Sequence, residues 1–366
     1  MARLETTFTD IRFPNPFLVS SSPSTTNARM IKKAVRAGWG GVVFKTVGLE
    51  PTTNPSPRMA VLRDGRYKKG MLNIELISDL TVGQWVDELK SIRDAFPERP
   101  VIASIMGGGR AEDWHQVIAL LEPHGVNAFE LNVSCPNFAH GGRGAQLGQD
   151  PESLAGWARE ATRLPVWVKL TPNVADVVPL AQVAKEQGAD AIVATNTLSG
   201  MAGVDLECFA PLPAVGGIGI FGGYSGPGLK AVALRCAASI GRSIDIPLAG
   251  CGGISSWRDA ALNEYLDAHG FTSVDELVGR ALPQLRSYPD IDLSIKLLAY
   301  VDPNKCNGCG LCVKACDAGG FEALFMQDKK AVVDVLKCDG CGMCVGICTS
   351  DGIQMVPKSD PPALGG

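Results

Sequence analysis

The stretch PLAQVAKEQGADAIVATN at residues 179–196 decides the fold class of this chain. Its first half has the apolar spacing of an amphipathic helix, Gly188 stands where a helix C-cap is expected, and 191–195 is a short, continuously apolar strand. The same unit recurs at 28–46 and 115–132, each time with a glycine at the matching place. Short buried strands that alternate with helices predict a parallel sheet covered by helices.

Segments of this kind predict seven core strands. They are FLVSS at 17–21, GVVFK at 41–45, VIASIM at 101–106, AFELN at 128–132, VWVKL at 166–170, AIVAT at 191–195 and IPLAGC at 246–251. A closed barrel of alternating strands and helices needs eight. We therefore predict an α/β fold, a TIM-type (β/α)8 barrel in which one βα unit is missing.

The segments after the seventh strand read as helices, at 259–270 and 274–285. LSIKLLAYV at 293–301 is a possible eighth strand, although it stands where a linker is expected. A length of 366 residues agrees with about two domains. The expected division is a barrel over residues 1–300, a second domain over 301–358 and a Pro/Gly-rich, disordered tail over 359–366.

Composition argues against several classes of function. A net charge of −4 and a pI near 5.7 disfavour nucleic-acid binding, which needs a basic surface. No apolar run reaches the ~18 residues of a membrane span, and residues 1–16 lack the apolar core of a secretory signal. We therefore expect a cytoplasmic protein that binds neither membranes nor nucleic acid.

Eight of the twelve cysteines lie near the carboxyl terminus, in two runs of the pattern Cys-x2-Cys-x2-Cys-x3-Cys. This spacing is typical of two 4Fe–4S clusters, with the fourth cysteine of each run binding the other cluster. Zinc ribbons are the alternative, but they use two ligands per knuckle. The pattern predicts a small α+β two-cluster ferredoxin domain. One ligand set is Cys306, Cys309, Cys312 and Cys348, and the other is Cys338, Cys341, Cys344 and Cys316.

The cysteine runs depart from the usual motif at one point, because Asp317 and Thr349 stand where proline commonly follows the fourth cysteine. Proline does not bind iron, so the change bears on reduction potential or loop geometry rather than on cluster assembly. Two neighbouring clusters conduct electrons, which requires a redox partner at each end.

Polar residues gather where the predicted barrel strands end, the face that carries function in such barrels. Lys45 and Lys169 each end a strand, and a lysine there can stabilise the negative charge of a reduced isoalloxazine ring. A surface position is the commoner fate of lysine. A loop asparagine is likewise more often a turn residue. The neutral groups suited to hydrogen-bonding an amide-rich ring are Asn73, Asn132, Asn196 and Thr197.

Cys135 stands in a loop immediately beyond a strand, where a thiol can give or take a proton. An inert, buried thiol is the alternative, and it fits Cys208, Cys236 and Cys251 better. His140, five residues after Cys135, is a second candidate acid.

The candidate phosphate or ring contacts are the glycines Gly222, Gly223, Gly226, Gly252 and Gly253. GGIGIFGG at 216–223 has the letters of a dinucleotide fingerprint, but it follows no buried strand and no helix begins directly after it. We therefore predict no NAD site in this chain.

Five motifs, together with the cysteine runs, closely resemble dihydropyrimidine dehydrogenases. They are LNIELIS at 72–78, IASIM at 102–106, ELNVSCPN at 130–137, VKLTPNV at 168–174 and GADAIVATNT at 188–197. The similarity covers nearly the whole chain and is greatest to the FMN and iron–sulfur subunit of the bacterial NAD-dependent enzyme; dihydroorotate dehydrogenases are more distant relatives. The resemblance implies an FMN-binding barrel, two 4Fe–4S clusters, reduction of uracil or thymine to the 5,6-dihydro base, and a partner subunit in which NADH reduces FAD. We also expect an oligomer.

The resemblance also assigns roles to residues. Cys135 corresponds to the general acid that protonates carbon 5 of the base, while flavin N5 delivers hydride to carbon 6. Groups that bind the pyrimidine correspond to Asn73, Asn132, Ser134, Asn196 and Thr197. FMN contacts correspond to Ser21, Lys45, Thr46, Lys169, Gly226, Gly252 and Gly253.

The chain departs from these relatives after the seventh strand. WRDAAL at 257–262 runs directly into NEYLDAHG at 263–270, and about thirty residues, the length of one βα unit, are absent. In the family the eighth strand closes the FMN phosphate site, so its absence is expected to affect FMN affinity. Three explanations stay open: a chain altered relative to its parent, a barrel closed by another segment such as 293–301, or a degenerate barrel.

Three functions follow from these observations. The first is a pyrimidine reductase that works with an NADH-oxidising partner. The second is a dihydroorotate dehydrogenase-like enzyme, for which we identify no basic group to bind the substrate carboxylate. The third is an electron carrier in which the ferredoxin domain is fused to a barrel that no longer holds flavin. The flavin content of the purified protein distinguishes the third from the other two.

Overall fold

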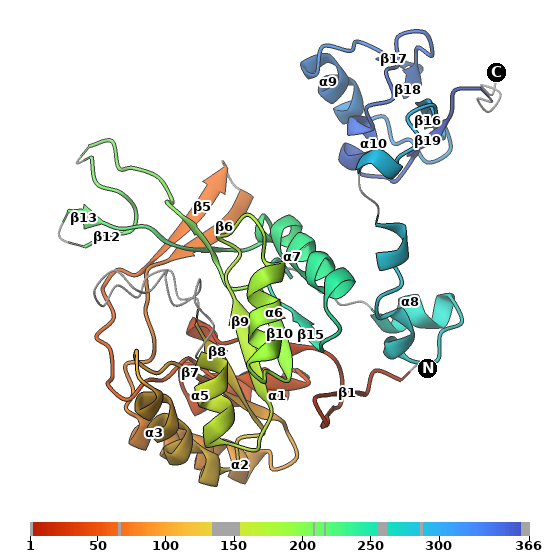
Figure 1. The fold of residues 1–366 in the computed structure, drawn as a ribbon. Coiled ribbons are helices and arrows are strands. Elements are labelled where there is room, and N and C mark those ends of the chain that lie inside the picture. Colours follow the sequence, from red (N-terminus) through yellow and green to blue (C-terminus); the bar gives the residue numbers. More distant parts are fainter. Residues whose placement is uncertain are drawn as a thin grey trace. The chain divides into compact units, whose positions relative to one another are not determined.

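The computed structural model describes residues 3–64, 67–133, 154–207, 209–215, 217–254, 262–285 and 288–359 (Figure 1). Contacts along the chain divide it into two compact units, Met1–Pro283 and Gln284–Gly366. This division falls before residue 300, because β16 (Leu297–Val301) pairs with β19 (Ile353–Pro357) inside the second unit. The alternative in which 293–301 closes the barrel is therefore wrong.

The first unit is built on a seven-stranded parallel sheet with the order β15-β10-β9-β8-β7-β4-β3. Its strands are β3 (Leu18–Val19), β4 (Gly41–Val43), β7 (Val101–Ile105), β8 (Ala128–Asn132), β9 (Val166–Leu170), β10 (Ala191–Ala194) and β15 (Leu248–Gly250). Each lies within one of the seven predicted segments, so the predicted strands are confirmed. Among the described residues no eighth strand joins this sheet, and β3 and β15 are its edges, as the sequence predicts.

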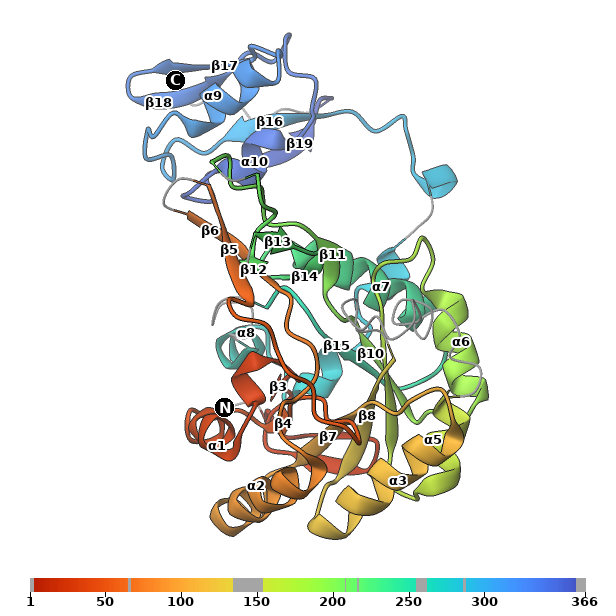
Figure 2. The ribbon, with the colours of Figure 1, turned by 90° about the vertical axis from the view of Figure 1, so that its left-hand side faces the viewer.

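Helices follow the strands and cover the outer face of the curved sheet (Figure 2). They are α1 (Ala28–Arg36), α2 (Val82–Ala95), α3 (Ala111–Leu121), α5 (Leu154–Ala161), α6 (Val178–Glu186) and α7 (Leu229–Ser243). Buried side chains such as Ile31 and Trp85 form one core with the outward faces of the strands. Gly38, Gly125 and Gly188 have φ angles of 99°, 84° and 90°, which confirms the left-handed C-caps predicted for them.

A hairpin of β1 (Thr6–Phe8) and β2 (Ile11–Phe13) closes the amino-terminal end of the barrel. Phe13 is buried in one cluster with Val43, Ile102 and Trp167. The indole N–H of Trp167 donates to Thr9 Oγ1 at 2.9 Å. The amino-terminal end of the barrel interior is thus filled by apolar side chains, which leaves the carboxyl end for polar groups.

A second, antiparallel sheet is not indicated by the sequence pattern. Its order is β11-β14-β6-β5, with β5 (Met59–Asp64), β6 (Tyr67–Asn73), β11 (Leu198–Gly200) and β14 (Gly222–Ser225). A small hairpin of β12 (Ala214–Val215) and β13 (Ile218–Gly219) precedes β14. Gly219 lies in β13, and Gly222 and Gly223 lie in β14, so these three glycines belong to antiparallel strands rather than to a strand–loop–helix turn.

The helix predicted at 274–285 is wrong. The segment forms two 3-10 turns, η4 (Val274–Leu277) and η5 (Leu282–Gln284). Gly279 lies between them with φ of 74°, which is incompatible with a continuous helix. Within the other predicted helix, at 259–270, residues Leu262–Ala268 form α8.

The second unit has a small α+β fold that repeats itself. β16 pairs with β19, β17 (Leu324–Gln327) pairs with β18 (Lys330–Val333), and α9 (Leu311–Ala318) contacts α10 (Met343–Ile347). The two halves match at a spacing of 32 residues, which separates Cys306 from Cys338 and Cys316 from Cys348. This is the ferredoxin-like domain that the cysteine pattern predicts.

Matching glycines show how closely the two halves of the second unit correspond. Gly308 and Gly340 have φ angles of 74° and 78°. A Cβ atom on either would lie 2.3 Å from a backbone oxygen, that of Lys329 or that of Leu297. Both positions therefore require glycine. No helix in the described part of the chain is long and apolar enough to cross a membrane.

Candidate active site and cluster sites

A chain of hydrogen bonds joins the ends of β4, β8 and β10. Asn132 Nδ2 donates to Thr46 Oγ1 at 2.9 Å, and Asn196 Nδ2 donates to Asn132 Oδ1 at 3.1 Å. The Asn196 amide oxygen accepts from the backbone N–H of Thr197 at 2.8 Å. Four residues that the sequence singled out thus meet at the carboxyl face of the barrel.

Thr46 anchors this chain to the barrel core. Its side chain is buried, and its Oγ1 lies 2.8 Å from Ser104 Oγ and 3.2 Å from Ser21 Oγ. The backbone N–H of Thr46 also donates to Ser21 Oγ at 3.0 Å. Ser21, predicted as a flavin contact, therefore joins the network through Thr46, and Ser104 is a supporting residue that sequence reasoning missed.

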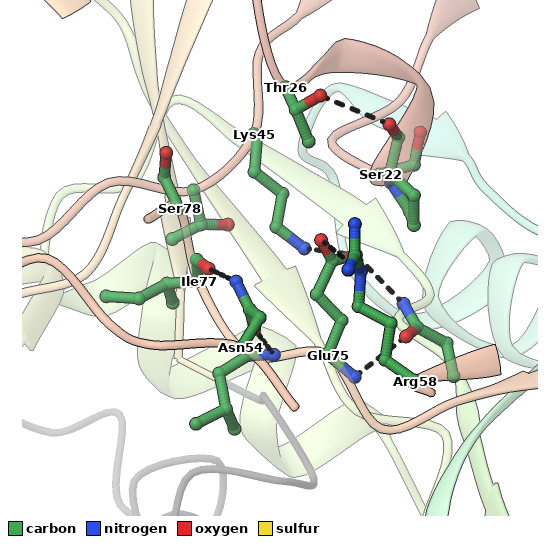
Figure 3. A network of polar contacts seen from close by, with 12 residues as sticks. Ser22, Thr26, Lys45, Asn54, Arg58, Glu75, Ile77 and Ser78 are labelled. Carbon is green, nitrogen blue, oxygen red and sulfur yellow. Dashed lines mark hydrogen bonds and ion pairs between the residues drawn. The ribbon is translucent and has the colours of Figure 1, made fainter. Parts of the chain in front are cut away.

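Lys45, which precedes Thr46 in the sequence, forms a buried ion pair with Glu75 (Figure 3). Lys45 Nζ lies 3.2 Å from Glu75 Oε2, and the two side chains are only 7% and 3% exposed. Arg58 Nε lies 3.5 Å from the other oxygen of Glu75. Asn73 Nδ2 donates to Glu75 Oε2 at 3.4 Å, and Asn73 Oδ1 accepts the backbone N–H of Glu75 at 2.7 Å. A buried carboxylate between two cations therefore stands beside the predicted substrate residue Asn73.

The side chain of Asn54 holds the loop that carries Glu75 in place. Asn54 Oδ1 accepts the backbone N–H of Leu76 at 2.7 Å, and Asn54 Nδ2 donates to the carbonyl of Ile77 at 3.0 Å (Figure 3). Sequence reasoning missed Glu75. The signal that could have identified Glu75 is its spacing of two residues from Asn73. In an extended segment this spacing places both side chains on the same face.

The two groups of polar side chains are joined through Gly223 of β14. Gly223 is the register partner of Asn73, and a Cβ atom on it would lie 2.2 Å from Thr197 Oγ1. The result is a closed arrangement, here called the polar ring. Its members are Lys45, Thr46, Asn73, Glu75, Asn132, Asn196 and Thr197. The polar ring offers amide donors, amide and carboxylate acceptors and hydroxyl groups, which suits a flat ligand with both carbonyls and N–H groups.

A second buried ion pair lies in the barrel next to the polar ring. Lys169 Nζ is 3.4 Å from Glu130 Oε1, with side-chain exposures of 6% and 1%. Lys169 is the register partner of Asn132 across β8 and β9. Burial lowers the pKa of Lys169, but the Glu130 carboxylate and the Cys251 thiol outweigh burial and raise the pKa above its ordinary value. Lys169 is therefore a fixed positive charge at this place.

The three predicted glycine contacts lie apart from the polar ring, around the start of α7. Gly252 and Gly253 have φ of 117° and 79°. A Cβ atom on Gly253 would lie 2.4 Å from the backbone nitrogen of Lys230, in the first turn of α7. A Cβ atom on Gly226, which has φ of 119°, would lie 2.7 Å from Gly70 Cα. These glycines let the backbone approach a helix N-terminus, which is a general site for phosphate groups.

The residues at the carboxyl face fit an FMN group. Thr195 Oγ1, at the end of β10, is a buried hydroxyl with no hydrogen-bond partner in the described part of the chain, so a ligand can satisfy it. Lys45 and Lys169 supply positive charge, and the glycine loops bring the backbone close to the start of α7, where a phosphate can bind. Cys135 and Ser134 lie outside the described residues, and their roles stay predictions.

In the second unit, Cys306, Cys309, Cys312 and Cys348 line one small pocket. These four are the predicted first ligand set, and they come from both halves of the repeat. No three His, Cys, Asp or Glu side chains within the described ranges converge on a site for a single metal ion.

The second predicted ligand set is Cys316, Cys338, Cys341 and Cys344, in the matching places of the repeat. Backbone N–H groups donate to two of these sulfurs, from Ala323 to Cys316 at 3.3 Å and from Ala299 to Cys338 at 3.5 Å. Burial raises the pKa of the Cys344 thiol to about 11, so iron binding has to displace its proton. The ten cysteines in the described ranges are free thiols.

Comparison with known proteins agrees with this architecture. The dihydroorotate dehydrogenase family matches residues 3–270, and the 4Fe-4S dicluster domain matches residues 298–349. NAD-dependent dihydropyrimidine dehydrogenase subunit PreA of Escherichia coli (strain K12) is 33% identical over 363 residues, 89% of this chain and 88% of that protein. The chloroplastic dihydropyrimidine dehydrogenase (NADP(+)) of Arabidopsis thaliana is 31% identical over 79% of each chain. The catalytic subunit of dihydroorotate dehydrogenase B (NAD(+)) of Methanosarcina mazei is 38% identical over 69% of this chain and 78% of that protein. The resemblance identified from the motifs is confirmed.

Proposed function

The chain belongs to the dihydroorotate dehydrogenase family, and from that membership we propose that it reduces the 5,6 double bond of uracil or thymine. It is a flavin and iron–sulfur oxidoreductase in which FMN is bound by the barrel and two 4Fe–4S clusters by the second unit. The observation that carries the proposal is the polar ring, which gathers neutral amides, hydroxyls and one ion pair at the carboxyl face of a flavin-type barrel.

The polar ring favours a neutral pyrimidine over a carboxylated one. Uracil and thymine carry two carbonyls and two N–H groups, which match the donors and acceptors of Asn73, Asn132 and Asn196. The second candidate substrate, dihydroorotate, carries a carboxylate. Lys45 and Arg58 are both already paired with Glu75, so neither is a dedicated partner for a substrate carboxylate. This observation supports the dihydropyrimidine reading over the dihydroorotate reading.

The chemistry divides between the cofactor and the chain. When bound, FMN supplies a hydride to carbon 6 of the base. Cys135 donates a proton to carbon 5, which prevents an enolate from accumulating. The asparagines of the polar ring orient the base, and the charge of Lys169 favours a negatively charged flavin ring. The start of α7 with Gly226, Gly252 and Gly253 holds the phosphate.

Electrons reach the barrel from outside this chain. We propose that a partner subunit oxidises NADH at FAD and passes electrons to the two clusters, since a close relative is named as a subunit of an NAD-dependent enzyme. Eight of the ten described cysteines are the proposed cluster ligands, and Cys236 and Cys251 form no disulfide with each other; this usage fits a reducing compartment, and we place the protein in the cytoplasm.

One anaerobic assay tests the proposed function without the partner. FMN, iron and sulfide are quantified in the purified protein, and reduced viologen then drives turnover of uracil, thymine and orotate. We expect one FMN and two clusters per chain, with uracil or thymine consumed and orotate spared. Asn132→Ala is expected to abolish most turnover, whereas Asn304→Ala, at an exposed position of the second unit, serves as control. Clusters without flavin would favour the electron carrier, and faster turnover of orotate would favour the dihydroorotate reading.

A further inference from the structure

The two cysteine sites of the second unit differ in their surroundings. The repeat spacing of 32 residues pairs each position of one half with a position of the other. For brevity, site one is Cys306, Cys309, Cys312 and Cys348, and site two is Cys338, Cys341, Cys344 and Cys316. Four paired positions carry different chemistry at the two sites, and all four favour a reduced cluster at site one. A fifth pair acts in the opposite direction, because the Asp351 carboxylate near Cys348 of site one corresponds to Gly319 in the other half.

Two hydroxyl groups contact the sulfurs of site one. Thr349 Oγ1 lies 3.8 Å from Cys309 Sγ, and Ser350 Oγ lies 3.6 Å from Cys348 Sγ. A sulfur bound to iron carries no proton, so in each pair the hydroxyl is the donor. Asn307 Nδ2 donates to Thr349 Oγ1 at 3.4 Å, which leaves the threonine hydrogen directed to sulfur.

Lys330 adds a positive charge beside site one. Its Nζ donates to the backbone carbonyl of Cys306 at 2.6 Å. The position that corresponds to Lys330 in the other half is Leu298, which is buried and uncharged. The ammonium group therefore acts on one site of the pair.

The corresponding positions at site two carry carboxylates or no polar group. Asp317 corresponds to Thr349, Asp339 to Asn307, and Ala318 to Ser350. Asp317 and Asp339 are both exposed. An ionised carboxylate cannot donate a hydrogen bond and adds negative charge near its site, and alanine does neither.

These differences act on the reduction step. Reduction of a cluster adds one negative charge, part of which spreads onto the cysteine sulfurs. Hydrogen-bond donors and nearby positive charge stabilise the reduced form, and carboxylates destabilise it. We propose that Thr349, Ser350 and Lys330 set the reduction potential of the cluster at site one above that of the cluster at site two. An electron that enters the pair then rests first at site one. This inference depends on the proposed presence of two clusters.

A redox titration of the intact chain, followed by electron paramagnetic resonance, tests the inference. We expect two separate reduction waves. The double variant Thr349→Val/Ser350→Ala keeps the side-chain volumes but removes both hydroxyls. It is expected to lower the reduced-to-oxidised ratio of the higher wave about tenfold at a fixed ambient potential, or about 59 mV for one electron. The lower wave is expected to stay in place. Ser294→Ala, which removes an exposed hydroxyl bonded to Asp292, is the matched control.

The reciprocal variant Asp317→Thr/Ala318→Ser places hydroxyls at site two and is expected to raise only the lower wave. If the first variant loses its clusters, the reciprocal variant still tests whether these hydroxyls raise the reduction potential. Coincident waves in the unaltered protein, or waves that neither variant moves, would overturn the inference. Iron and sulfide analysis separates this result from a failure of the proposed function, because fewer than two clusters per chain would contradict that proposal instead.

Discussion

Replacement of Glu130 by glutamine tests the buried ion pair next to the polar ring. Glu130 and Lys169 are 1% and 6% exposed, and their charged atoms are 3.4 Å apart. Glutamine keeps the shape of the side chain but removes its charge, so the ammonium of Lys169 stays buried without that counter-charge. Removing one partner of a buried pair costs about 3–5 kcal/mol. Because a glutamine oxygen still accepts a hydrogen bond, we expect the free energy of unfolding to fall by about 3 kcal/mol, at the lower end of that range.

Urea unfolding followed by tryptophan fluorescence measures this cost. All six tryptophans lie between residues 39 and 257, so their signal reports on the first unit. Glu98→Gln, at an exposed loop position, is the control and is expected to change the free energy of unfolding by less than about 0.5 kcal/mol. The double variant Glu130→Leu/Lys169→Met removes both charges and is expected to recover most of the loss. If Glu130→Gln is as stable as the control, the buried pair does not support the site as we argue.

The pH dependence of the same variant gives an independent check. In the unaltered protein the pKa of Lys169 is raised, so the contribution of the pair is present below the unfolded value of about 10.4 and is lost as pH rises through the folded pKa. Without Glu130, burial lowers the pKa of Lys169, and the unfolded chain then binds the proton more tightly. Stability of the variant therefore rises with pH, and its deficit is expected to narrow between pH 7 and pH 10. A stability deficit of Glu130→Gln that stays the same from pH 7 to pH 10 would show that the substitution does not act through the pKa of Lys169.

Three further substitutions test the flavin and electron-transfer sites. Cys135→Ser is expected to keep FMN but lose most turnover with uracil, and full activity in the anaerobic assay would exclude Cys135 as the acid. Cys309→Ala is expected to block reduction of FMN by the partner subunit but to spare reduction by dithionite, so flavin bleaching by both donors would contradict its role as a cluster ligand. Gly253→Ala introduces a Cβ atom 2.3 Å from Lys230 Cα at a φ of 79°, and we expect FMN affinity to fall more than tenfold in a fluorescence titration. Gly250→Ala, whose Cβ would meet nothing within 4 Å, is the control, and equal affinities would remove the start of α7 from the phosphate site.

The parallel sheet could be predicted because each of its strands is a short apolar run next to a helix with a local capping signal, as at Gly188. The antiparallel sheet could not. β11 and β14 read LSG and GGYS, which have little strand propensity, and they form through pairing with residues far away in the sequence. Strand propensity alone therefore does not reveal elements that long-range pairing creates.

The candidate site shows the same limit. Asn132 and Asn196 could be predicted because each directly follows or ends an apolar strand. The ion pairs of Glu75 and Glu130 could not be predicted, because the partner of each carboxylate is a lysine that is distant in sequence. Glu130 meets Lys169 from 39 residues away, and Glu75 meets Lys45 across the face of the barrel. The sequence places residues at the correct face, but the pairing of charges depends on the register of the folded chain.

The most direct test of the account is the anaerobic addition of dihydrouracil to the oxidised, purified chain. The reverse reaction requires no partner subunit, because the base itself supplies the electrons. We predict that the absorbance of bound flavin near 450 nm bleaches and that excess uracil restores it. Flavin that stays oxidised in a protein with one FMN and intact clusters per chain would contradict the claim that this chain acts on the pyrimidine double bond.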